Sequence, residues 1–169
     1  VEAYLTMADT YPDHPETPEA LNRAAEAYED ARDFEGAAEM LVDLATRYPD
    51  DDERAPEALF QAGLLAYRDE ELEDAKATWQ MLVDDHPDHD RAQAAHFWLG
   101  KTYLATGQTL SATHALSQAV VADPWDFYGL QAQDALAGNP EFEPIAMTLT
   151  SCATPNSQQE AETWLASWL

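Results

Sequence analysis

The residues with the clearest chemical potential are the histidines and aspartates of "DDHPDHD", which runs from Asp84 to Asp90. Imidazole nitrogens and carboxylate oxygens of this kind bind zinc and related divalent metals. The run falls at a turn, however, and its counterparts elsewhere in the chain also carry proline and acidic residues. Side chains of this type commonly cap the helix that follows a turn. We therefore interpret the run as a solvated capping turn and predict no metal site.

Three other patterns lead to the same conclusion about chemistry. The run "PDDDE", Pro49 to Glu53, lacks the alternating ligands and the glycine of an EF-hand calcium loop. Cys152 ends "LTSC", which resembles a lipoprotein cleavage box, but no long apolar run precedes it. Paired carboxylates such as Glu26 and Glu29 could serve acid–base catalysis, yet 33 acidic residues make such pairs expected by chance. The sequence also has no GxSxG, Gly-rich phosphate loop, HExxH or CxxC. It predicts no catalytic site and no cofactor.

The charge of the chain restricts its partners. Asp and Glu number 33 against 8 Lys and Arg, which gives a formal net charge of -25. Nucleic acids and anionic membrane surfaces are bound through Lys and Arg, so neither is an expected partner. No apolar run approaches the roughly 20 residues of a membrane span, and we predict no transmembrane segment. The acidity serves either solubility or the attraction of a cationic ligand.

Four proline turns divide the chain into similar intervals, at Pro12, Pro49, Pro87 and Pro124. The intervals are 37, 38 and 37 residues long, and self-similarity at such a period is typical of repeat architectures. Within each interval, apolar residues recur three and four apart, which is the period of an amphipathic helix. A break near the middle of each interval indicates a short turn. Each interval therefore predicts a helical hairpin that ends at its proline, because proline cannot continue a helix.

These hairpins predict an all-α fold, a right-handed α-solenoid over residues 1–137. The expected hairpins occupy about 17–49, 55–87 and 92–124, and a capping helix follows at 125–137. Residues 1–11 fit the second helix of an earlier, truncated repeat, so the chain is expected to be a piece of a longer protein. A connector rich in Pro, Ser and Thr is expected at 138–157. A helix with an apolar face is expected at 158–169, packed against the solenoid or against a following domain.

The repeated positions resemble those of the tetratricopeptide repeat family over about residues 1–124. A small residue precedes tyrosine in the first helix, alanine opens the second helix, and a proline closes the hairpin: Ala25 and Tyr28, Gly100 and Tyr103, Ala37, Ala75 and Ala112. The tryptophan common in the family's first helix is absent, and each repeat exceeds the usual 34 residues. These departures indicate a looser variant of the same fold. The resemblance implies a module that binds a protein or peptide partner.

Stacked hairpins place their first helices on a concave surface, which solenoids use for binding. Helical phase assigns ten side chains to this surface: Asn22, Glu26, Glu29, Phe60, Leu64, Tyr67, Arg68, Phe97, Lys101 and Leu104. The surface is acidic at one end and aromatic in the middle. Some family members clamp acidic C-termini with Lys, Arg and Asn, but here only Arg68 and Lys101 supply comparable charge. The alternative is that the ten residues solvate or pack this face without binding anything.

The stretch "DPWDFYGLQAQDAL", Asp123 to Leu136, departs from the repeat pattern. Its "YGLQAQDAL" resembles the helix that closes the helical region of soluble lytic transglycosylases, and the tail "EAETWLASWL" resembles the segment before their catalytic domain. This resemblance implies the non-catalytic half of an enzyme that cleaves peptidoglycan in the cell envelope, outside the cytoplasm. Its implied partners are peptidoglycan or proteins of the envelope. Two alternatives remain: a plain capping helix, and a general tetratricopeptide adaptor that binds a protein partner or assists assembly.

Overall fold

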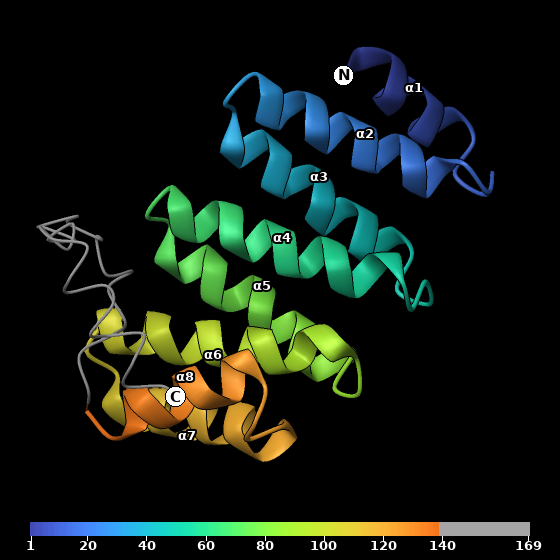
Figure 1. Cartoon of the computed structure of the whole chain (residues 1–169). Coiled ribbons are helices and arrows are strands. Elements are labelled where there is room, and N and C mark those ends of the chain that lie inside the picture. Colours follow the sequence, from blue (N-terminus) through green and yellow to red (C-terminus); the bar gives the residue numbers. More distant parts are fainter. Residues whose placement is uncertain (139–169) are drawn as a thin grey trace, which may run out of the picture. The chain divides into compact units, whose positions relative to one another are not determined.

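The computed structural model describes residues 1–138, and every regular element in this part of the chain is an α-helix (Figure 1). The helices are α1 (Glu2–Thr10), α2 (Thr17–Asp30), α3 (Phe34–Arg47), α4 (Arg54–Arg68), α5 (Leu72–Asp85), α6 (Asp90–Ala105), α7 (Thr109–Ala122) and α8 (Phe127–Leu136).

Each helix packs on the next one along the chain, so that α2–α3, α4–α5 and α6–α7 form three hairpins (Figure 1). Helix α1 packs on α2, and α8 packs on both α6 and α7. This arrangement confirms the predicted all-α solenoid. The helix predicted at 158–169 lies outside the described residues, as does the connector predicted at 138–157 apart from Gly138.

Within a hairpin, a small residue of the first helix faces a large residue of the second. Gly63 of α4 lies against the indole of Trp79 of α5, and Gly100 of α6 lies against Leu116 of α7. A methyl group at either glycine would overlap the opposite side chain. In the first hairpin Ala25 and Leu41, which occupy the equivalent positions, are buried in one cluster. The small residue thus allows the two helices to approach closely enough to exclude water between them.

The first helix of every hairpin ends in the same left-handed turn. Arg32, Glu70 and Gly107 have φ values of 60°, 65° and 75° and occupy equivalent places in the three repeats. The next residue donates its backbone N–H to a carbonyl five positions earlier: Asp33 to Tyr28 at 2.9 Å, Glu71 to Ala66 at 2.9 Å, and Gln108 to Tyr103 at 2.8 Å. This is the Schellman closure, in which glycine is the least strained residue. Only the third hairpin supplies that glycine.

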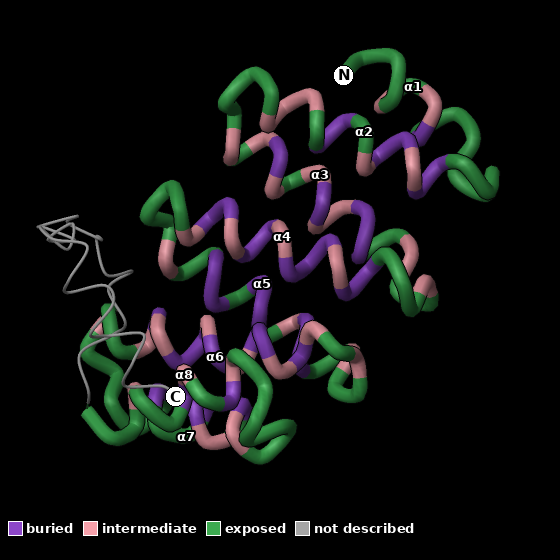
Figure 2. Tube along the Cα trace, viewed as in Figure 1, coloured by how far each residue is buried: buried purple, intermediate pink, exposed green. Residues whose placement is uncertain are grey.

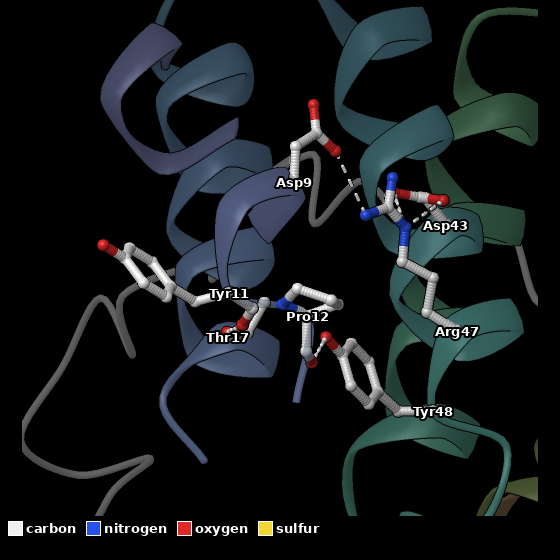
Figure 3. A network of polar contacts seen from close by, with 7 residues as sticks. All are labelled: Asp9, Tyr11, Pro12, Thr17, Asp43, Arg47 and Tyr48. Atoms are coloured by element: carbon white, nitrogen blue, oxygen red, sulfur yellow. Dashed lines mark hydrogen bonds and ion pairs between the residues drawn. The ribbon is translucent and has the colours of Figure 1, made fainter. Parts of the chain in front are cut away.

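Polar contacts attach the turn after α1 to the end of α3 (Figure 3). The hydroxyl of Tyr48 donates to the carbonyl of Pro12 at 2.6 Å, and the hydroxyl of Thr17 donates to the carbonyl of Tyr11 at 2.6 Å. Arg47 pairs with Asp43 at 2.9 Å and with Asp9 at 3.3 Å. The Tyr48–Pro12 and Arg47–Asp9 contacts join residues about one repeat apart and attach the turn after α1 to the end of the first hairpin.

The core lies along the seams between the helices, and the turns face solvent (Figure 2). The seams around α2, α3 and the middle of α4 hold aliphatic side chains with alanine. The seams from α4 to α7 add the large aromatic residue Trp79, whose exposed fraction is 0% and whose indole N–H donates to the carbonyl of Phe60 at 3.2 Å. Among the described helices, none combines the length and the hydrophobicity that a bilayer crossing requires.

We predict that Gly63→Ala destabilises the protein, although alanine is by itself the better helix former. The added methyl group meets the rigid, fully buried indole of Trp79, and overpacking of this kind costs about 1–3 kcal/mol. The free energy of unfolding should be measured by urea denaturation.

The double variant Gly63→Ala/Trp79→Leu restores the alanine–leucine pair of the first hairpin. It should therefore lose less stability than the two single changes added together, with a coupling free energy of about 1 kcal/mol. A Gly63→Ala protein as stable as the parent would contradict this account of the hairpin.

Candidate functional site

The first helices of the hairpins form one face of the solenoid, which we call the inner face and define by α2, α4 and α6. Helices α4 and α6 contact each other directly along this face. A cavity of about 870 Å³ opens there. It is lined by residues of α2, α4 and α6 together with two that follow α4: Glu29, Gln61, Leu64, Leu65, Tyr67, Arg68, Glu70, Leu72, Trp98 and Ala105. We call this cavity the inner groove.

Four of the ten residues assigned by helical phase line the inner groove, namely Glu29, Leu64, Tyr67 and Arg68. Two others lie close to its lining, since the Lys101 ammonium is 4.7 Å from the Trp98 ring centre and Leu104 is 43% exposed beside Ala105. These six residues therefore lie at or near one cavity, and their role in binding stays a prediction.

Asn22 and Glu26 lie outside the groove on α2. Glu26 is exposed and pairs with Arg23 at 3.1 Å, while Asn22 is half-buried. Neither residue lines the inner groove. Their role in binding stays a prediction.

Phe60 and Phe97 are buried in the core, with exposed fractions of 4% and 7%. Each is followed by a residue that lines the inner groove, Gln61 and Trp98, and these two occupy equivalent positions in successive repeats. On α4 the lining residues Gln61, Leu64, Leu65 and Arg68 follow the three- and four-residue spacing of one helix face. Leu64 and Arg68 therefore lie on the face of α4 that lines the groove, whereas Phe60 and Phe97 each lie one residue before a lining residue.

Three aromatic rings meet beneath the groove. The Tyr67 ring centre lies 5.3 Å from that of Trp98 in an edge-on arrangement, and Trp98 stacks on Trp79 at 5.8 Å. The indole nitrogen of Trp98 is buried and has no hydrogen-bond partner among the described residues. An unpaired buried donor costs about 1–3 kcal/mol. The ring is held instead by its aromatic neighbours and by the ammonium of Lys101 over its face.

The rim of the inner groove carries mixed charge. Glu29 and Glu70 contribute carboxylates, and Arg68 contributes a guanidinium that lies 3.6 Å from the ring centre of Phe34. Leu64, Leu65 and Leu72 give the groove an apolar floor. An apolar floor with a few polar groups at the edge suits a protein segment that buries one or two apolar side chains.

Residues 1–138 bring no cluster of metal-ligating side chains together. Groups of three or more His, Cys, Asp or Glu side chains able to hold a metal ion were not found among them. In the "DDHPDHD" run, His89 accepts a hydrogen bond from the Arg91 N–H at 3.1 Å and caps α6.

The protonation of His96 is affected by burial. His96 lies half-buried on α6 in a small cavity lined by α5, α6 and α7, together with His114. Burial lowers the pKa of His96 below its usual 6.5, the positive charge of His114 lowers the pKa further, and Asp84 opposes the shift. His96 is therefore held in its neutral form near pH 7.

The tetratricopeptide repeat family model matches residues 19–51 and 57–89. Solved structures that share the fold include the following two. A crystal structure of MamA is 19% identical, with a TM-score of 0.57 over 82% of this chain and 78% of that one. A Podosopora anserina protein assigned as a kinesin light chain, with nearly identical TPR-like repeats, is 17% identical. Its TM-score is 0.60 over 98% of this chain and 80% of that one. No curated protein matches significantly.

Residues 19–51 and 57–89 are thus similar to tetratricopeptide repeats, and the solved structures support the solenoid fold. Tetratricopeptide repeats indicate an interaction or scaffold module that takes protein partners. The two structures, both below 20% identity, bear on the fold alone.

We predict that the buried position of His96 makes stability depend on pH. Its folded pKa is below the unfolded value, so the unfolded chain binds the proton first as the pH falls below about 6.5. The free energy of unfolding should therefore decrease from about pH 7 to about pH 5.5, before most carboxylates titrate.

His96→Gln should remove this part of the pH dependence, and His114→Gln should reduce it by removing the neighbouring charge. Urea unfolding at several pH values measures the effect. A His96→Gln protein with the parent's pH dependence in this range would contradict the assignment.

Proposed function

We propose that this chain is a non-enzymatic adaptor that binds a segment of a partner protein in the inner groove. The observation that carries the proposal is the groove itself, whose apolar floor and mixed-charge rim are built by three successive hairpins. Tetratricopeptide repeats are interaction modules, and the family match covers the first two hairpins, from which most of the lining residues come.

The chemistry of the groove also supports the binding of a protein ligand by an acidic chain. Tyr67 and Trp98 are rigid aromatic side chains, and residues of this type dominate binding energy at protein interfaces. The Arg68 guanidinium can pair with a carboxylate of the partner, and Glu29 and Glu70 can pair with its basic residues. A segment with apolar anchors and charges of both signs is the occupant that this chemistry favours.

We predict that Leu64→Glu weakens peptide binding at the inner groove. The substitution places a carboxylate on the apolar floor, and burying it against a ligand should weaken binding by at least about tenfold. Peptides selected from a random phage-displayed library on the parent chain, measured by biolayer interferometry, provide the test.

The matched control is Leu110→Glu, because Leu110 is 89% exposed on α7 and lies outside the inner groove. Both variants should retain the helical circular dichroism of the parent. Selected peptides that bind the Leu64→Glu and Leu110→Glu proteins equally well would place binding elsewhere and refute the adaptor site.

The more specific prediction, the helical region of a lytic transglycosylase, rests on the "YGLQAQDAL" resemblance. The described structure gives these residues packing roles: Gly129 allows α8 to approach the carbonyl of Asp123, and Tyr128 packs on Phe97 at 5.6 Å. Gln133 donates to the carbonyl of Pro124 at 2.7 Å. A plain capping helix needs the same contacts. The family match therefore favours the general adaptor over the transglycosylase.

Peptidoglycan as a partner and the cell envelope as a location are predictions that depend on the transglycosylase hypothesis. If it holds, the isolated chain should sediment with purified sacculi, and soluble peptidoglycan fragments should compete. A chain that remains in the supernatant at physiological salt would remove peptidoglycan as a partner and leave the adaptor function intact.

A further inference from the structure

A second groove lies between the second helices of the first two hairpins. Its volume is about 630 Å³, and it runs between α3 and α5 beside the C-terminal end of α4. None of its lining residues lines the inner groove. We call it the outer groove. Its apolar surface comes from both helices and from the end of α4: Phe34, Ala38, Val42, Ala66, Ala77 and Met81.

The apolar residues follow one face of each helix. On α3 they recur every four residues from Phe34 to Val42, and on α5 Ala77 and Met81 are also four apart. The lining of α3 extends from Phe34 to Thr46, which is about 18 Å at 1.5 Å per residue. This length accommodates about three turns of a bound helix.

Carboxylates surround the apolar surface. Six of the residues that line the outer groove are acidic and none is Lys or Arg: Glu35, Glu39, Asp43, Asp69, Glu71 and Asp74. Asp43 pairs with Arg47. The ion pairs found among residues 1–138 involve none of the other five. Arg68 stacks on the Phe34 ring but does not line the groove.

This combination specifies the chemistry of an occupant. Apolar side chains can insert between α3 and α5, and positive charges can relieve the repulsion among the unpaired carboxylates. A second copy of this chain, with its net charge of -25, meets like charge here, and nucleic acids or anionic lipids do so as well. A basic amphipathic helix satisfies both requirements.

We propose that the outer groove binds a basic amphipathic helix of a partner protein, with its apolar face against α3 and α5 and its Lys and Arg side chains on the acidic rim. This site goes beyond the adaptor function proposed for the inner groove, since the two share no residue. Together the two grooves would let one chain hold two different segments at once.

The probe for the test is an 18-residue peptide of leucine, lysine and alanine in an amphipathic helical pattern, labelled with fluorescein. The affinity of this peptide for the full 169-residue chain is measured by fluorescence anisotropy at low and at physiological salt. Two control peptides accompany it: one with the same composition in scrambled order, and one with glutamate in place of lysine. The proposal expects binding of the first peptide and at least about tenfold weaker binding of both controls.

Matched variants locate the binding. The triple variant Glu35→Gln/Glu39→Gln/Asp74→Asn neutralises the rim, whereas Asp50→Asn/Asp52→Asn/Asp88→Asn removes the same charge from exposed turns outside both grooves. A further variant, Ala77→Lys, introduces bulk and positive charge at an exposed position of α5 inside the groove. The rim triple and Ala77→Lys should weaken binding by about tenfold or more, and the turn triple by about twofold or less.

Three outcomes would overturn the proposal. Equal weakening by the rim triple and the turn triple would show general attraction to an acidic protein. Equal affinity for the ordered and scrambled peptides would show that binding does not depend on an amphipathic helix fitting the outer groove. Loss of binding in the Leu64→Glu variant, with the outer-groove variants unaffected, would move the peptide to the inner groove. That last result would not contradict the adaptor function of the inner groove. The proposals for the inner and the outer groove can therefore fail separately.

Discussion

The whole solenoid depends on one steric relation, which is that a residue without a large side chain in the first helix of each hairpin faces a large side chain in the second. Ala25, Gly63 and Gly100 occupy this position, opposite Leu41, Trp79 and Leu116. Close helix approach at this point sets the geometry of every hairpin, and repetition of the hairpin sets the stacking. The two grooves follow from it, because first helices line up on the inner face while second helices leave a gap between α3 and α5.

The distribution of charge also follows from this stacking. The seams between helices exclude carboxylates, so the acidic residues gather on the turns and on the outer surfaces of the helices. Exposed ion pairs such as Arg23–Glu19 contribute little to stability. Apolar packing therefore stabilises the fold. The carboxylates remain on the surface, where they contact solvent and can contact a partner. The inner groove carries both signs of charge and the outer groove carries one, which gives the two surfaces different selectivity.

The fold could be predicted from the sequence because the residues that repeat along the chain are also the residues that pack the helices together. Proline spacing, small residues and helical periodicity predicted an α-solenoid of hairpins, and its all-α class is confirmed. The inner groove was only partly predictable. Helical phase assigned Phe60 and Phe97 to the groove, yet one position along a helix rotates a side chain by about 100°, and both rings are buried in the core. Trp98 could have been found from Lys101, because it lies three residues earlier on the same face of α6. The outer groove and the left-handed conformations of Arg32 and Glu70 left no pattern that single-sequence reasoning uses, since neither position is glycine.

The seam between the second and third hairpins differs in kind from the seam between the first and second. Trp79, Trp98 and Tyr67 bring three rings together there, whereas the earlier seam is filled by leucine and alanine. A stack in which each hairpin contacts mainly its neighbours unfolds in steps whose order reflects the strength of each seam. The aromatic seam should make α4 to α7 the most persistent unit, while α1 and the first hairpin open more often. Amide protons of α1 to α3 would then exchange with solvent first, and the grooves differ accordingly: the inner one is anchored in the persistent unit, and the outer one straddles its boundary.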